Sequence, residues 1–185
     1  EVLAGIPTVA IGLFALTALK PFLENFIPAL NSVPFAAGVA GLAIGLMIVP
    51  IIASISDDAM RSVPQGLREA SFGLGATKSK TATRVIVPAA MSGIVASIVL
   101  AGSRAIGETM IVLLAAGNTP NMDFSFSSSV QTMTTFIATT GTGDIATGTI
   151  TYKTIFAVGA LLFVMTLILN AISIRLVRKY REVYE

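Results

Sequence analysis

An arginine and a glutamate interrupt an otherwise apolar stretch of this chain, in the segment AGSRAIGETM. Arg104 and Glu108 are four residues apart, so in a continuous helix their side chains share one face and can pair. A charge at the centre of a bilayer costs about 2.5 to 3.5 kcal/mol even on insertion scales. Both groups must therefore face protein or water. Two interpretations remain open: a salt bridge that locks two helices together, or an anion pathway in which Arg104 donates to an oxyanion.

Glu108 bears on the kind of anion that such a pathway could carry. A carboxylate repels a fully ionised oxyanion such as sulfate, whereas phosphate keeps a P–OH group that can donate a hydrogen bond to it. A pair with net charge near zero also avoids holding the anion too tightly for passage. On the second interpretation, Arg104 and Glu108 are thus substrate-pathway residues that suit phosphate.

The composition is that of an integral membrane protein. Hydrophobic residues make up 54% of the 185 residues and charged residues only 12%, against about 25% charged residues in soluble domains. The chain has no cysteine and no histidine, which excludes disulfides, thiolate nucleophiles and Cys/His metal sites. No GxxxxGK[ST], HExxH or GxSxG pattern is present. We expect no catalytic residue and no cofactor or metal in this chain, and an intramembrane enzyme is a distant alternative.

Four runs are long enough to cross about 30 Å of hydrocarbon, for which a helix needs roughly 20 residues. They extend over residues 2–19, 35–55, 89–116 and 152–177. We therefore expect an all-α polytopic helical bundle with four transmembrane helices in one domain, residues 1–185. Pro7 and Pro50 should kink the first two helices. The chain starts at Glu1 without a signal-peptide pattern, so we expect it to be a segment of a longer protein.

The distribution of basic residues predicts the orientation. Short cytoplasmic loops collect Lys and Arg, and residues 56–88 and the C-terminal end hold nearly all of them here. They are Arg61, Arg68, Lys78, Lys80, Arg84, Arg175, Arg178, Lys179 and Arg181, against Lys20 and Lys153 on the other side. The loop 56–88 and the C-terminus should therefore be cytoplasmic, and the loop 117–151 should face outward.

Both loops carry helical signals. In the cytoplasmic loop, residues 68–74 read as a short helix that Gly75 ends. A second helix over 77–87 should end before Pro88, because the residue preceding a proline is disfavoured in helical geometry. In the outer loop, Val130, Met133, Phe136 and Ile137 fall at helical spacing, with Ser128 or Ser129 as the N-cap.

The spelling of the cytoplasmic loop resembles a known motif. Glu69, Ala70 and Ser71, then Gly75, then the run 85–88 are similar at every anchor to the EAA loop of ABC importer permeases. The departures from that pattern are Ser71 for the second alanine and two valines in the final run. The resemblance implies the type I ABC importer permease (MetI-like) fold.

The same resemblance implies that residues 68–76 form a coupling helix that docks into a separate cytoplasmic ATPase subunit. The residues that would carry this ATPase coupling are Arg68, Glu69, Ala70, Ser71, Gly75 and Ala76. ATP and Mg²⁺ would then be bound by the partner ATPase subunits and not by this chain. Without the resemblance, the residue pattern fits an ordinary solvated loop equally well.

The segment GSRAIGETM, followed by a small apolar run and GNTP, resembles PstC-type permeases of phosphate ABC importers. Arg104 and Glu108 fall on the two charged positions that this family is taken to place on the phosphate path. PstA-type permeases usually continue Glu-Thr-Ala-Pro where this chain has Met110 and Ile111 after Thr109. Family members have six spans, of which the first two would be missing here.

The resemblance also implies partners and a location. The partners are a PstA-like permease, two PstB-like ATPase subunits, an external PstS-like phosphate-binding protein, membrane lipid and inorganic phosphate, with no nucleic acid. The location is the cell inner membrane. The alternatives are a permease for molybdate or sulfate and an ATP-independent anion channel or carrier, in which loss of the coupling loop would leave passive flux intact.

Overall fold

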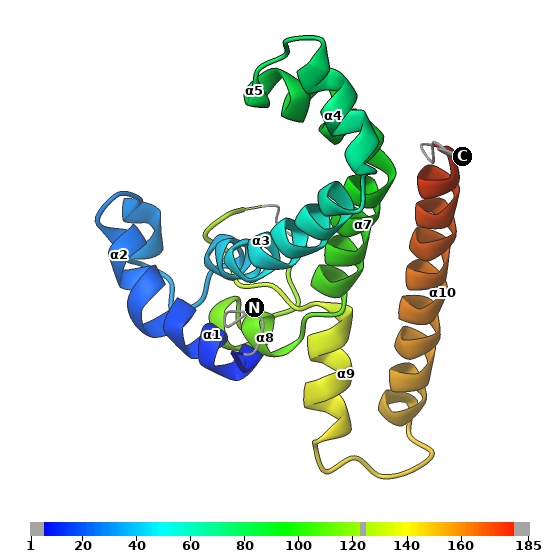
Figure 1. Cartoon of the computed structure of the whole chain (residues 1–185). Helices are drawn as coiled ribbons and strands as arrows, with labels where there is room; N and C mark the ends of the chain where they lie inside the picture. The colour runs from blue at the N-terminus through cyan, green and yellow to red at the C-terminus, as the bar shows by residue number, and fades with distance from the viewer. Residues whose placement is uncertain (1–5, 123–124, 180–185) are drawn as a thin grey trace. The chain divides into compact units, whose positions relative to one another are not determined.

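The computed structural model describes residues 6–122 and 125–179, with side chains up to Arg175. All regular elements in these ranges are helical (Figure 1), which confirms the expected all-α class. The expected start of the first span at Val2 and the tail from residue 180 lie outside the described residues. The chain divides into two compact units, Glu1–Ile48 with Arg104–Leu167, and Val49–Ser103 with Ile168–Glu185.

Two helices are long and apolar enough to cross a membrane by themselves. They are α3 (Ala37–Arg61) and α10 (Ile150–Lys179), which contain the second and fourth predicted spans. A third crossing is counted if the helices over Lys78–Ala89 and Met91–Ile106, bent by 68° at their junction, form one broken span. By length and composition the described residues therefore contain two or three spans, where the sequence predicted four.

The first predicted span is a helical segment made of three consecutive helices. They are α1 (Thr8–Phe14), the π-helix η2 (Ala15–Leu19) and α2 (Lys20–Glu24). Pro7 is the N-cap of α1, so the expected kink at this proline was wrong. A proline just before a helix loses no intrahelical hydrogen bond. Pro50 lies inside α3, which continues through it.

The end at Pro88 expected for the helix over 77–87 was also wrong. The helix continues from α5 (Lys78–Thr81) through the π-helix η4 (Ala82–Ile86) into α6 (Val87–Ala89), which contains Pro88. A proline in a helix lacks an N–H and its ring collides with the carbonyl four residues earlier. The wider π turn relieves this crowding. A π-helix also precedes a proline in the first helical segment, where η2 is followed directly by α2, which contains Pro21.

Small side chains form the core of the first unit. Its fully buried residues include Ala15, Ala36, Ala40, Ala43 and Ala115. Small residues let helix backbones approach closely in a membrane protein, where apolar surface alone gives little drive for association. The short 3₁₀ helix η3 (Pro28–Leu30) completes this core with Leu30, which is fully buried.

Carbonyls from distant segments accept hydrogen bonds from the backbone N–H groups at the start of α3. Ala36 N–H donates to the Ala115 carbonyl at 2.9 Å, Ala37 N–H to the Ser128 carbonyl at 2.9 Å, and Gly38 N–H to the Phe126 carbonyl at 2.8 Å. The N-terminal N–H groups of a helix have no partner within the helix. These bonds tie the start of α3 to segments far away in the sequence.

The helix expected within the loop 117–151 exists but begins later than expected. It is α9 (Met133–Gly141), and its N-cap is Thr132, which forms a reciprocal capping box with Thr135. Neither Ser128 nor Ser129 is the N-cap, and Val130 precedes the helix. Thr135 can supply the second half of the box because its hydroxyl accepts from the Thr132 N–H at 2.9 Å.

In the second unit, the C-terminal part of α3 packs closely against α7 (Met91–Ile106). The Ser56 and Ser97 hydroxyls are hydrogen-bonded at 2.9 Å, and Ser97 is fully buried. A Cβ added to Gly93 would lie 2.3 Å from the Cβ of Ala59, so only glycine fits there. These contacts join the helices that precede and follow the segment containing α4, α5 and α6.

Candidate functional site

The third predicted span is broken at the two charged residues. α7 ends at Ile106, and α8 (Met110–Ala115) begins only after three non-helical or turn residues. Gly107 is a poor helix former, and the hydroxyl of Thr109 competes for local backbone groups by donating to the Gly107 carbonyl at 3.3 Å. The expected continuous helix over 89–116, with Arg104 and Glu108 on one face, was therefore wrong.

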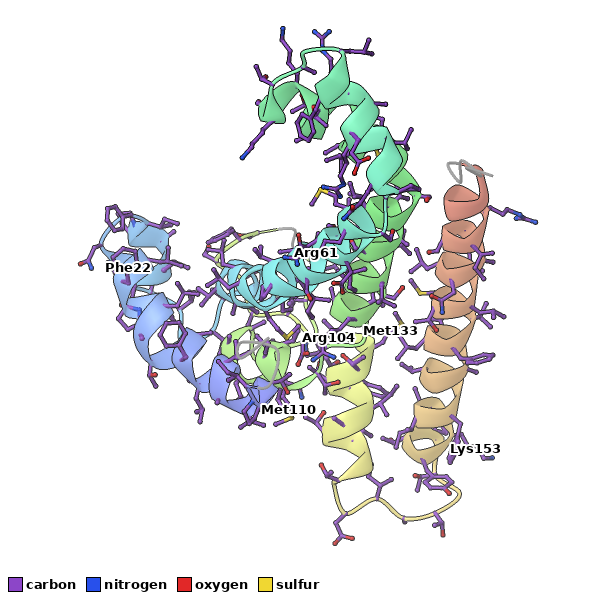
Figure 2. All side chains as sticks on the ribbon, in the orientation of Figure 1. Phe22, Arg61, Arg104, Met110, Met133 and Lys153 are labelled. Atoms are coloured by element: carbon purple, nitrogen blue, oxygen red, sulfur yellow. The ribbon has the colours of Figure 1, made fainter. Side chains whose placement is uncertain are left out.

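Arg104 lies in the last turn of α7 (Figure 2). Its side chain is exposed, and no hydrogen bond or ion pair to another described residue engages the guanidinium. A cation is favoured at a helix C-terminus, where the backbone carbonyls carry partial negative charge. The five N–H donors of the guanidinium are thus available to an external oxyanion.

Glu108 is held by backbone groups. One carboxylate oxygen accepts a hydrogen bond from the Ile111 N–H at 3.3 Å in the first turn of α8, and the residue is only 8% exposed. Its own carbonyl accepts from the Thr134 hydroxyl of α9 at 3.0 Å. A carboxylate at a helix N-terminus satisfies an otherwise unpaired N–H and suits the positive end of the helix dipole.

The sequence left open a salt bridge between these two charges. The ion pairs among the described residues are Lys20–Glu24 and Arg61–Asp57, and Arg104 and Glu108 form none. The charges therefore have separate environments: Arg104 is exposed and unengaged, and Glu108 is buried at the start of α8. Sequence reasoning missed Thr134, whose only signal was a hydroxyl in the predicted outer-loop helix.

The loop 56–88 is built around α4 (Gln65–Gly73), which ends in a Schellman motif. Gly75 has φ +77°, a left-handed conformation that glycine adopts without steric cost. Gly75 N–H donates to the Phe72 carbonyl at 2.9 Å, and Ala76 N–H donates to the Ser71 carbonyl at 3.1 Å. The predicted stop at Gly75 is confirmed, although α4 starts three residues before the predicted Arg68, directly after its N-cap Pro64.

Two side-chain hydrogen bonds tie this loop to its neighbours. The Arg68 guanidinium donates to the Met60 carbonyl at the end of α3, at 2.6 Å. The Ser71 and Thr81 hydroxyls are bonded at 2.9 Å, with Ser71 8% and Thr81 1% exposed. The serine that departs from the EAA pattern therefore connects α4 to α5.

The outer surface of α4 is exposed and partly apolar. Glu69 and Ala70 are exposed, as are Phe72 at 46% and Leu74 at 89%. Phe72 and Leu74 thus add apolar surface next to the polar side chain of Glu69. Phe72 and Leu74 were missed by sequence reasoning, although two large apolar residues beside Gly75 in a polar loop were a usable signal.

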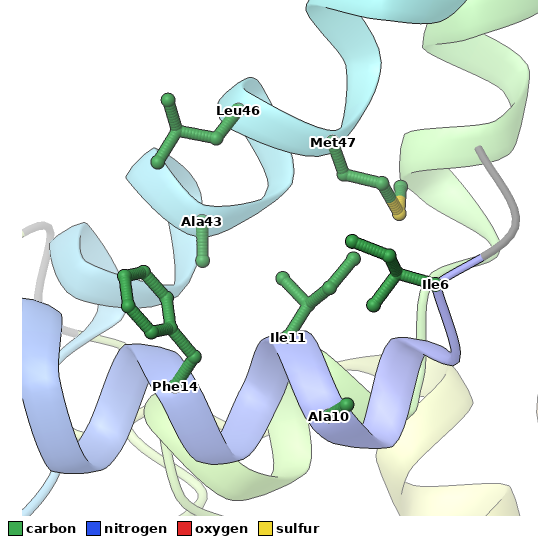
Figure 3. A pocket seen from close by; sticks show the side chains of 7 residues that line it. All are labelled: Ile6, Ala10, Ile11, Phe14, Ala43, Leu46 and Met47. Atoms are coloured by element: carbon green, nitrogen blue, oxygen red, sulfur yellow. The ribbon is translucent and has the colours of Figure 1, made fainter. Parts of the chain in front are cut away.

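A cavity of about 470 Å³ lies between α1 and α3 in the first unit (Figure 3). Its walls are apolar side chains, among them Ile11, Phe14, Ala43 and Met47. Such walls have no donor that could replace the hydration of an anion. The cavity is therefore distinct in chemistry from the oxyanion site that Arg104 could form.

Comparison with protein families decides the class of the protein. The family described as binding-protein-dependent transport system inner membrane component matches residues 1–182. The chain belongs to this family. It is accordingly a multi-pass inner membrane component of a transport system rather than an enzyme, and the resemblance to ABC importer permeases is confirmed.

Individual relatives extend over most of the chain. The probable ABC transporter permease protein YqgH of Bacillus subtilis is 39% identical over 90% of this chain and 53% of its own length. Phosphate transport system permease protein PstC of Mesorhizobium japonicum is 33% identical over 94% of this chain and 58% of its own. PstC of Haemophilus influenzae is 32% identical over 98% of this chain and 62% of its own length. The chain thus spans little more than half the length of these relatives, and no solved structure gives a significant match.

Proposed function

We propose that this chain is part of the transmembrane permease subunit of an ATP-driven phosphate importer. The observation that carries the proposal is the likeness, over nearly the whole chain, to permeases named for phosphate transport in several organisms. The chemistry of Arg104 supports it, because an exposed and unengaged guanidinium in an apolar region matches the geometry of phosphate oxygens.

Glu108 takes a different role from that of a simple partner of Arg104. One oxygen of its carboxylate accepts a hydrogen bond from the Ile111 N–H, and we propose that the carboxylate also accepts a hydrogen bond from the P–OH group of the passing phosphate. A carboxylate held by the backbone stays in one place while cargo passes. It would discriminate against sulfate, which has no proton to donate at neutral pH.

The cytoplasmic loop would couple transport to ATP hydrolysis on separate subunits. Phe72 and Leu74, with Glu69 and Ala70, form the surface that would dock into the ATPase. The Arg68–Met60 and Ser71–Thr81 hydrogen bonds would transmit its movement to α3 and α5. ATP and Mg²⁺ would be bound by two PstB-like subunits, and a PstA-like permease and a PstS-like binding protein would complete the importer.

The proposed assembly also implies how the chain is oriented in the membrane. The loop containing α4 and α5 and the C-terminus would be cytoplasmic, and α9 would lie on the outer side, where phosphate is delivered. Paired permeases would then alternate between inward-open and outward-open states, with ATP binding shifting the population between them.

The test is uptake of radiolabelled phosphate, with sulfate and molybdate as controls, by cells that carry the full-length permease and its partner subunits. Arg104→Gln should lower phosphate uptake at least tenfold at equal membrane abundance, because a hydrogen bond to a charged group contributes about 1.5–3 kcal/mol. Lys153→Gln is the matched control, since Lys153 is an exposed cation near the start of α10 (Figure 2). Undiminished uptake by Arg104→Gln would remove Arg104 from the pathway, and uptake of only another anion would exclude phosphate.

A further inference from the structure

One polar side chain in the apolar part of α10 differs in its hydrogen bonding from the hydroxyl side chains near it. The hydroxyls of Thr154, Thr166 and Ser173 all donate to carbonyls three or four residues earlier in the same helix. Such bonds satisfy a hydroxyl inside an apolar span without any neighbour. Asn170 instead reaches another helix: its Oδ1 accepts from the Ser103 hydroxyl of α7 at 3.3 Å.

This contact leaves the amide nitrogen of Asn170 available. The bond from Ser103 uses the amide oxygen, and no hydrogen bond to another described residue engages the two N–H donors. Asn170 is exposed, within an apolar window in which none of the residues is buried in this chain. An amide group without a hydrogen bond costs several kcal/mol in hydrocarbon. This face of α10 must therefore meet protein or a polar path, as intramembrane polar residues do.

We propose that Asn170, oriented by Ser103, is a cargo contact that donates amide hydrogen bonds to the transported oxyanion. The inference rests on the proposed function as an anion permease. A neutral donor adds recognition of phosphate oxygens without adding positive charge, so it favours entry of the anion without trapping it. Ser103 is a positioning residue, because its hydroxyl holds the amide oxygen and turns the nitrogen away.

The alternative is that the pair serves only as a link between helices. Interhelical hydrogen bonds in membranes average about 0.6 kcal/mol, and such a link is lost equally when either partner is removed. The two roles therefore differ in a double-mutant cycle. Ser103→Ala keeps the amide donors, whereas Asn170→Leu removes them and is well tolerated by an apolar span.

The experiment measures phosphate uptake at saturating phosphate, per permease in the membrane, in cells carrying the full-length chain and its partner subunits. We expect Asn170→Leu to lower uptake about tenfold, Ser103→Ala to lower it less than about threefold, and the double variant to be as slow as Asn170→Leu. Thr166→Val is the matched control on α10, one turn before Asn170, and should transport normally. If Asn170→Leu fails to accumulate, Asn170→Ala replaces it.

Two outcomes would overturn the inference. Equal effects of Ser103→Ala and Asn170→Leu, with no further loss in the double variant, would assign the pair to helix packing. Normal uptake by Asn170→Leu would remove Asn170 from the path. Failure of the proposed function has another signature, because the unaltered complex would then take up no phosphate. The cycle would in that case be run with the oxyanion that is transported, and the same comparison would decide the role of Asn170.

Discussion

Replacement of Gly75 by alanine tests whether the Schellman motif stabilises the conformation of the loop 56–88. Gly75 has φ +77°, and a Cβ added there would meet no atom within 4 Å. The cost of Gly75→Ala is therefore conformational and not steric, about 1–2 kcal/mol for a left-handed residue other than glycine. Gly73→Ala is the matched control, since Gly73 is the last residue of α4 and has equally open surroundings. Alanine there should stabilise the helix by at most about 0.5–1 kcal/mol.

The expected readout is the rate at which trypsin cleaves after Lys78 and Lys80, which follow the motif. A loss of 1–2 kcal/mol raises the population of the opened loop by roughly 5- to 30-fold. At low protease, cleavage follows that population. Gly75→Ala should therefore raise the cleavage rate by roughly 5- to 30-fold in detergent-solubilised permease. Gly73→Ala should leave the rate unchanged or lower it.

Equal cleavage rates for the two variants would refute this reasoning, because they would show that the left-handed turn contributes nothing to the order of the loop. A rise in both variants would refute it as well, since any added methyl group would then disturb the loop. Phosphate uptake measured in parallel would report whether the opened loop still performs its proposed coupling to an ATPase.

Two further predictions concern packing in the second unit. Gly93→Ala would place its Cβ 2.3 Å from the Cβ of Ala59 and force α3 and α7 apart, so we expect a lower melting temperature in detergent. Adding Ala59→Gly to the same chain should restore the melting temperature. A melting temperature that does not recover would contradict the close contact. Ser71→Ala leaves the buried Thr81 hydroxyl without its partner and should destabilise the loop by about 1–3 kcal/mol, measured by trypsin cleavage. Adding Thr81→Val to Ser71→Ala should recover most of the lost stability. If the destabilisation by the two substitutions were instead additive, the hydrogen bond between the two hydroxyls would be contradicted.

Features of the loop 56–88 were predictable because they depend on neighbours in the sequence. Gly75 ends α4 as expected, since a left-handed C-terminal residue is a local property that glycine supplies. The family could be inferred from residues 69–88 for the same reason, because that spacing is read along the chain. The start of α4 after Pro64 was missed, although a proline just before a helix is also a local signal.

The charged pair shows where local reasoning failed. Spacing of four residues predicted a shared face, but this holds only in an unbroken helix. The break after Ile106 is stabilised by the Thr134 hydroxyl, which bonds to the Glu108 carbonyl from a helix more than twenty residues away. The sequence around residue 108 does not predict that contact.

The sequence alone thus determined that the protein is helical, resides in the membrane and carries an EAA-like loop, because composition and local spacing decide these properties. Only the tertiary structure decided that Arg104 is unengaged while Glu108 is buried, that Ser71 connects two helices, and that Asn170 meets Ser103. Each of these depends on atoms brought together from distant parts of the chain, and their energy comes from packing and hydrogen bonds that no single segment contains.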